Sequence, residues 1–188
     1  MTRRQVRRAW AVMCACLVWA ASAAATEISV ELTGTGQHVI KIAVPQFVAQ
    51  GNASDILEAQ LAPVLRNDLR ISGFFDTLEN DAGRIDGVQR EDNASGEVQF
   101  AQWADLGARL LVKGTYQLQG NGLILECRVF DTLGGDFLLG KRDESEVSQA
   151  RTIIHRFADE IILKITGARG MSSSKLVFVS NRNGAKEL

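Results

Sequence analysis

The segment 149–166 restricts the fold more than any other part of the chain, because its apolar residues recur at i, i+3 and i+4 spacing. This spacing predicts an amphipathic helix with one apolar face, which needs an apolar surface to pack against. We expect Ser148 to cap the helix and Gly167 to end it. The apolar face consists of Ala150, Ile153, Ile154, Phe157, Ala158, Ile161, Ile162 and Ile165.

Three runs before this helix have the pattern of β-strands and are joined by glycine-containing turns. The runs are 109–118, 123–131 and 137–147. Glycine supplies the positive φ that tight hairpins require, so the runs predict three antiparallel strands. Cys127 alternates with apolar neighbours in the second run, and we expect a buried, unreactive thiol.

The first part of the chain predicts two further strands. Residues 28–32 (ISVEL) alternate apolar and polar side chains, as a half-buried strand does. Residues 39–44 (VIKIAV) form the second run, which stops at Pro45 because proline cannot donate to a sheet ladder.

Asp55 is predicted to cap a second amphipathic helix, with Glu58 completing a capping box. Pro63 lies inside the apolar pattern and is expected to kink the helix or split it. Gly73 is expected to follow its end. The apolar face consists of Ile56, Leu57, Leu61, Val64, Leu65 and Leu69.

The region between this helix and the three strands has little apolar pattern. Residues 79–97 are polar and rich in Gly, Asp and Asn, which indicates a mobile loop. Residues 98–107 predict a short helix in which Trp103 anchors the core. Together these elements predict an α/β (α+β) domain over 26–168: a two-layer sandwich of a mixed sheet with the two main helices on one face.

Residues 1–25 have the three parts of a secretory signal peptide. Four arginines stand in the first eight residues, 9–21 are apolar, and small residues lead to Ala25. We predict cleavage after Ala25. The apolar run is shorter than the roughly 20 residues that span a bilayer, which favours a signal peptide over a membrane anchor. No stable membrane insertion is expected after cleavage. The arginines leave a twin-arginine export route open.

The charge of the remaining chain argues against nucleic acid as a partner. Without those four arginines, 17 basic residues stand against 22 acidic ones, a net charge of -5. Such a domain has no basic field to hold a phosphate backbone. Cys127 is the single cysteine after residue 25, so the mature chain has no internal disulfide.

The tail changes in composition. Residues 169–174 are expected to form a linker, and 175–180 (KLVFVS) to form a strand followed by Asn183-Gly184, a hairpin signal. We therefore interpret 175–188 as the truncated start of a further β-rich domain.

The exported part of the sequence resembles the TolB family. The segments that carry the resemblance keep their order behind an export signal, and the last of them resembles the opening of a propeller blade. They are ISVEL at 28–32, IAVPQF at 42–47, LRNDLRISGFFDTL at 65–78, WADLGARLLVKGTY at 103–116 and LVFVSNRNGAKEL at 176–188.

This resemblance implies a periplasmic interaction protein of the Tol–Pal system, which maintains the outer membrane and acts in cell division. It implies an N-terminal α/β domain followed by a six-bladed β-propeller, most of which this sequence lacks. The propeller binds Pal in the family, and the N-terminal strand of the mature chain meets TolA. On this sequence the TolA-binding residues are Thr26, Glu27, Ile28, Ser29, Val30, Glu31 and Leu32. The alternative is that this strand binds no partner and only completes the sheet of its own domain.

The sequence carries no recognisable catalytic motif. Histidines 38 and 155 are far apart, and His155 is predicted to be solvated on the polar side of its helix. No P-loop or G-x-S-x-G segment is present, so we predict no enzyme activity, no cofactor and no metal site. The alternative is the front of an exported, propeller-bearing serine peptidase, in which a G-x-S-x-G segment would lie beyond the propeller.

Overall fold

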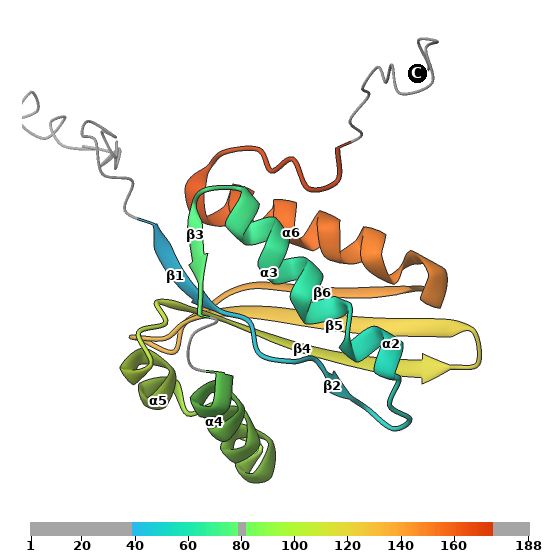
Figure 1. Ribbon diagram of the computed structural model, residues 1–188, viewed down its shortest axis with the longest axis horizontal. Coiled ribbons are helices and arrows are strands. Elements are labelled where there is room, and N and C mark those ends of the chain that lie inside the picture. Colours follow the sequence, from blue (N-terminus) through green and yellow to red (C-terminus); the bar gives the residue numbers. More distant parts are fainter. Residues whose placement is uncertain (1–38, 79–81, 175–188) are drawn as a thin grey trace, which may run out of the picture. The chain divides into compact units, whose positions relative to one another are not determined.

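The computed structural model describes residues 39–78 and 82–174, which form a mixed sheet with helices on both faces (Figure 1). The strands lie in the order β3-β1-β4-β5-β6, and β2 pairs beside β4. Their bounds are β1 Ile40–Ala43, β2 Val48–Ala49, β3 Phe75–Thr77, β4 Leu110–Gln119, β5 Gly122–Asp131 and β6 Phe137–Glu146.

The direction of the strands divides the sheet into two halves. β1 is parallel to β3 and to β4, whereas β4, β5 and β6 form the predicted antiparallel meander. Ile42 pairs with both Thr77 and Leu110, which places β1 inside the sheet. The mixed sheet and the three antiparallel strands are thereby confirmed, and the short strands β2 and β3 are additions to the predicted set.

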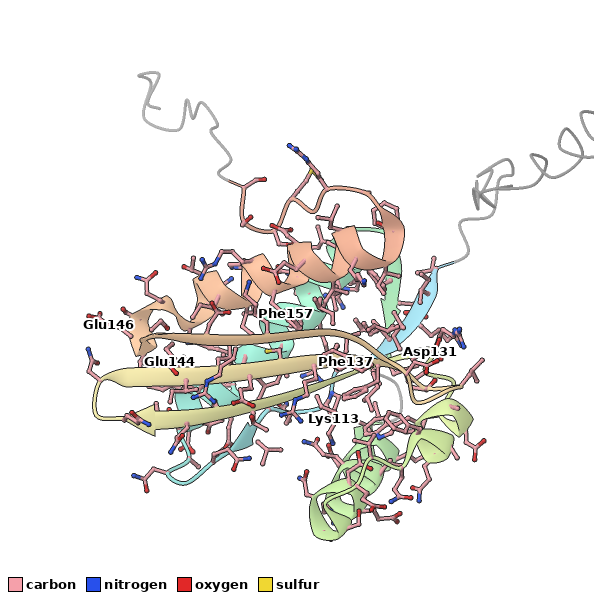
Figure 2. All side chains as sticks on the ribbon, turned by 180° about the vertical axis from the view of Figure 1, so that it is seen from behind. Lys113, Asp131, Phe137, Glu144, Glu146 and Phe157 are labelled. Atoms are coloured by element: carbon pink, nitrogen blue, oxygen red, sulfur yellow. The ribbon has the colours of Figure 1, made fainter. Side chains whose placement is uncertain are left out.

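Two helices, α3 (Leu61–Ile71) and α6 (Ala150–Thr166), cover one face of the sheet (Figure 1). The predicted apolar faces of both helices enter the main core together with the inward side chains of β4 and β5. Ile56 is the exception: it lies in the short helix over residues 55–58 and is 66% exposed, contrary to the prediction. Figure 2 shows Phe157 on this side and Lys113 on the other. Gly167 ends α6 with a φ of 73°, as predicted.

Two of the predicted helix caps are wrong. Ser54, and not Asp55, caps the short helix α2 (Asp55–Glu58), and Glu58 instead accepts a hydrogen bond from the Tyr116 hydroxyl at 3.2 Å. Ser148 lies in a 3-10 turn, η1 (Val147–Gln149), and gives α6 no cap.

The predicted effect of Pro63 is confirmed as a split, because α2 and α3 are separate helices and the proline lies in the first turn of α3. The first turn tolerates proline, since its backbone N–H groups have no partner inside the helix.

The opposite face of the sheet carries two helices, α4 (Ala82–Ser95) and α5 (Phe100–Asp105). The loop predicted over 79–97 is wrong, since α4 occupies most of it. Its apolar pattern is weak: among its described side chains, Ile85 is buried in the smaller core around Trp103 and Val88 packs against that core partly buried. α5 confirms the predicted short helix, and Trp103 is fully buried as expected.

Candidate interaction surfaces

The predicted partner-binding segment, Thr26 to Leu32, and the predicted cleavage site at Ala25 lie outside the described residues. So do 175–188, and both predictions therefore stand as predictions. The described chain begins at Val39 and leads directly into β1, where the Ile40 N–H donates to the Phe74 carbonyl at 2.9 Å. The domain thus receives its N-terminal segment at one end of an inner strand.

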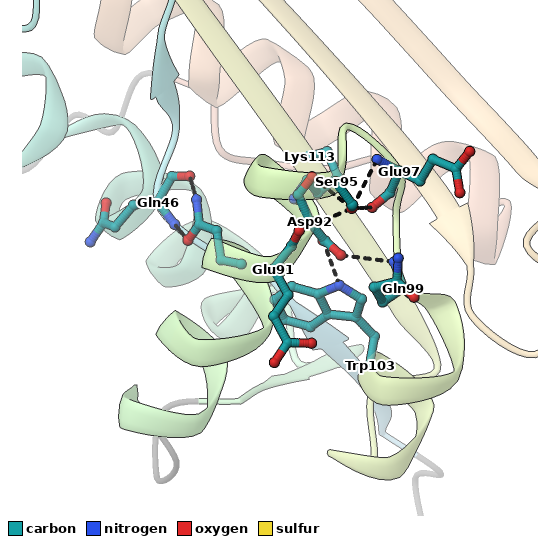
Figure 3. Close-up of polar contacts among 9 residues, drawn as sticks. Gln46, Glu91, Asp92, Ser95, Glu97, Gln99, Trp103 and Lys113 are labelled. Carbon is teal, nitrogen blue, oxygen red and sulfur yellow. Dashed lines mark hydrogen bonds and ion pairs between the residues drawn. The ribbon is translucent and has the colours of Figure 1, made fainter.

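Asp92 is the centre of a buried polar cluster that holds α4 and α5 to the sheet (Figure 3). Its carboxylate accepts hydrogen bonds from the Gln99 N–H at 2.8 Å, the Trp103 Nε1–H at 2.9 Å and the Lys113 ammonium at 2.8 Å. The Lys113 ammonium also lies 5.9 Å from the centroid of the Trp103 ring, where a cation is attracted. Because every partner is a donor from this chain, the cluster stabilises the fold and offers no open ligand position.

A second polar contact joins α4 to the loop after β1. Gln89 and Gln46 exchange two hydrogen bonds, from the Gln46 N–H at 3.2 Å and from the Gln89 amide at 2.6 Å. The Arg66 guanidinium donates to the Val44 carbonyl at 3.2 Å on the other side of this loop. A shallow groove of about 580 Å³ lies here between α3 and α4. Arg66 and Arg70 line this groove, and both interact with other groups of the chain. The groove therefore gives no indication of an anion-binding site.

His155 is not solvated, contrary to the prediction from its place on the polar side of α6. Its Nδ1 lies 2.5 Å from the Asp68 carboxylate of α3, and the Arg151 Nε–H donates to its Nε2 at 3.2 Å. Burial raises the pKa of Asp68 above its ordinary value, against the lowering effect of the hydrogen bond with His155. The three side chains fasten α3 to α6 across the outer surface of the helix pair.

Asp159 fixes the segment that follows α6. Its carboxylate accepts hydrogen bonds from the Ser172 N–H at 2.8 Å, the Ser173 N–H at 3.0 Å and the Ser173 hydroxyl. Burial raises the pKa of Asp159, but these hydrogen bonds outweigh burial and leave the pKa below its ordinary value. The segment 169–174, predicted as a linker, is therefore held against α6 by these hydrogen bonds.

An apolar groove of about 330 Å³ lies between this segment and α3. Ile71 and Met171 line it and are 71% and 75% exposed, respectively. Phe74 and Ile162 contribute further apolar lining, and Ser174 lies at the edge where the described chain ends. The groove thus brings together two strongly exposed apolar side chains.

The described residues contain no group of three or more side chains placed to hold a metal ion. None of the helices in the same ranges is long and apolar enough to cross a membrane. Cys127 is buried as predicted, and burial raises the pKa of its thiol, which makes the reactive thiolate scarce.

Comparison of the sequence with models of known protein families identifies the family of this chain. The family model of the TolB amino-terminal domain matches residues 28–138, more than half of the chain. The chain belongs to the TolB family. Among its relatives, the Tol-Pal system protein TolB of Syntrophotalea carbinolica is 38% identical over 168 residues and that of Geobacter sulfurreducens 35% identical over 159 residues.

These TolB relatives are considerably longer. The alignments cover 89% and 84% of this chain but 39% and 36% of the two relatives, so the chain spans about two fifths of their length. The crystal structure of TolB from Acinetobacter baumannii has the same fold, with a TM-score of 0.55 over 72% of this chain and 30% of that one, at 22% identity. The mixed sheet with its helices is thus the fold of a TolB amino-terminal domain.

Proposed function

We propose that this chain is a periplasmic, non-catalytic interaction protein of the Tol–Pal system that binds TolA through Thr26 to Leu32. The observation that carries the proposal is the extent of the family match, which begins at residue 28 and so includes most of this segment. Membership in the TolB family supports a role in outer-membrane integrity and cell division. The contact with Pal belongs, in this proposal, to the propeller of longer TolB proteins.

An extended segment can bind a partner by adding a strand to the edge of its sheet. Backbone hydrogen bonds then supply affinity, and alternate side chains supply specificity. In this segment Ile28, Val30 and Leu32 alternate with Ser29 and Glu31, so three apolar side chains lie on one side of a strand.

The described fold supports this mode of binding. The described residues from Val39 onward form a sheet and two apolar cores. Residues 26–38 number thirteen and reach up to about 40 Å when extended, at 3.3 Å per residue. In this proposal the partner binds the segment while the domain remains folded.

The test is a pull-down with the C-terminal domain of TolA as bait. We expect the chain beginning at Thr26 to be retained, and the chain lacking 26–33 to be lost. Val30→Asp should weaken retention about tenfold or more, because the proposal buries an apolar side chain at this position and aspartate would put a charge there. Ser29→Asp, on the other side of the strand, is the matched control and should bind as the wild type does.

Each variant is first checked by the fluorescence of Trp103, which is buried in the domain far from the segment in sequence. Equal retention of the full and shortened chains, or no retention of either folded protein, contradicts the proposal. Equal losses for Val30→Asp and Ser29→Asp contradict the strand-pairing mode but leave TolA as the partner.

A further inference from the structure

The two ring nitrogens of His155 have partners of opposite hydrogen-bonding character. Its Nδ1 lies 2.5 Å from an oxygen of the Asp68 carboxylate on α3, and its Nε2 accepts a hydrogen bond from the Arg151 Nε–H at 3.2 Å, one turn earlier on α6. A guanidinium can only donate hydrogen bonds, so the Nε2 atom must carry the lone pair. In neutral imidazole the proton is then on Nδ1, which donates it to the carboxylate. The two neighbours together fix one tautomer of His155.

The fixed tautomer determines where a further proton is added to the ring. Protonation takes place at Nε2, because that atom holds the lone pair. The contact with Arg151 then consists of two facing N–H donors that both carry positive charge, so the hydrogen bond is lost and replaced by repulsion. On the other side of the ring, the contact with Asp68 becomes an ion pair.

The two partners also differ in their freedom to move. The side chains of Asp68 and His155 are 8% and 22% exposed, whereas Arg151 is an exposed residue. The carboxylate and the imidazole are thus held between α3 and α6, but the guanidinium can turn into water.

We propose that His155 is a proton-controlled switch for Arg151. Neutral imidazole holds the guanidinium on the surface of α6, and protonated imidazole releases it to water while retaining Asp68. The outer surface of the helix pair thereby gains one positive charge and a free guanidinium in acid, and α3 stays fastened to α6. The inference does not depend on the TolA contact.

Other charged groups of the elements packed around His155 leave this contact unchanged. Asp159, one turn later on α6, already accepts hydrogen bonds from the segment that follows the helix. Arg156 pairs with Asp143 of β6 at 3.9 Å. Arg169 lines the groove beside α3. Among the described residues, none of these four forms a hydrogen bond with a ring nitrogen of His155.

NMR of the isotope-labelled full chain tests the proposal. Long-range proton–nitrogen spectra distinguish a protonated ring nitrogen from a bare one, and we expect Nδ1–H with a bare Nε2 in neutral His155. When His155 takes up a proton, exchange of the Arg151 Nε–H with water should rise about two- to tenfold relative to Arg156, the range that one hydrogen bond supports. Arg156 is the control because it is on the same helix and pairs with a carboxylate instead of an imidazole.

Two variants identify the group that takes up the proton. His155→Gln keeps an acceptor but has no titratable ring, so the pH-dependent change at Arg151 should disappear. Asp68→Asn keeps an acceptor for the Nδ1–H and removes the carboxyl group, so the change at Arg151 should remain. Lys164→Ala, at an exposed position of the same helix, should behave as the wild type does.

Melting temperatures show which variants are folded, and the wild-type spectra decide the tautomer independently of the variants. Neutral His155 with its proton on Nε2 overturns the proposal, and so does exchange at Arg151 that does not respond to protonation of His155. A change at Arg151 that persists in His155→Gln and is lost in Asp68→Asn also overturns it, because the carboxyl group is then the switch.

Discussion

At the scale of single residues, Asp92 shows how one carboxylate can hold a helix that has little apolar surface. Its side chain is 2% exposed and pairs with Lys113, whose side chain is 18% exposed. Both charged groups are largely shielded from water. The carboxylate also accepts hydrogen bonds from the Trp103 indole N–H and the Gln99 backbone N–H. Loss of one charge leaves the other without its partner, which costs more than loss of an exposed pair.

Asp92→Ala should therefore lower the free energy of unfolding by about 3 to 5 kcal/mol. Urea unfolding monitored by Trp103 fluorescence measures the change. Glu160→Ala is the control, because it removes the exposed pair with Lys141 and should cost less than about 1 kcal/mol. Similar losses of unfolding free energy for the two variants would show that the buried Asp92 cluster stabilises the protein no more than an exposed ion pair does.

Asp159 permits a prediction of pH dependence. Its pKa in the folded protein is lowered from 3.8, so the folded state binds fewer protons than the unfolded state as the pH falls toward that value. The stability that the carboxylate contributes is present above pH 3.8 and is lost as the pH falls through the lower folded pKa.

The titration of the Asp159 carboxyl carbon, followed by NMR, should thus have its midpoint below 3.8. Substitution of both Ser172 and Ser173 by proline, which removes both backbone donors and the hydroxyl, should raise the midpoint. A wild-type midpoint at or above 3.8 would contradict the hydrogen-bonded arrangement.

At the scale of elements, α4 and β4 differ in the space that surrounds their glycines. An added Cβ at Gly87, in the middle of α4, has no heavy atom within 4 Å. At Gly114 in β4, a Cβ would lie 2.6 Å from the Phe47 ring. The same substitution at the two positions therefore has opposite expected effects.

Gly87→Ala should stabilise the protein by about 0.5 to 1 kcal/mol, because alanine loses less backbone entropy in a helix. Gly114→Ala should destabilise it by about 1 to 3 kcal/mol, since Phe47 must move in a packed core. Thermal unfolding followed by circular dichroism measures both. No stabilisation at Gly87 would be the result expected of the loop predicted over 79–97 and not of a helix.

At the scale of the whole molecule, the predicted signal peptide determines which residues reach the partner. If the signal peptidase cuts after Ala25, the exported chain begins with Thr26 and the proposed TolA-binding segment is at its free end. The small residue at position 23 is needed because the peptidase excludes large side chains there.

The N-terminal sequence of protein recovered from the periplasm should therefore begin at Thr26. Ala23→Phe should block processing and leave the longer chain attached to the inner membrane, whereas Ala20→Leu, inside the apolar run, should be processed normally. Wild-type protein found unprocessed in the cytosol would contradict both export and the proposed function.

The sequence by itself determined the three antiparallel strands, the inner strand β1, both main helices and their apolar faces, because each has a periodicity fixed by its own backbone geometry. It also carried the segments that resemble the TolB family. The tertiary structure alone decided what depends on contacts between distant residues. Buried Asp92 holds α4 to the sheet, and His155 pairs with Asp68 at a separation of 87 residues. Asp159 likewise fixes the segment 169–174 by hydrogen bonds. Side chains that stabilise by pairing leave no repeating pattern along the chain, so only the folded arrangement brings their partners together.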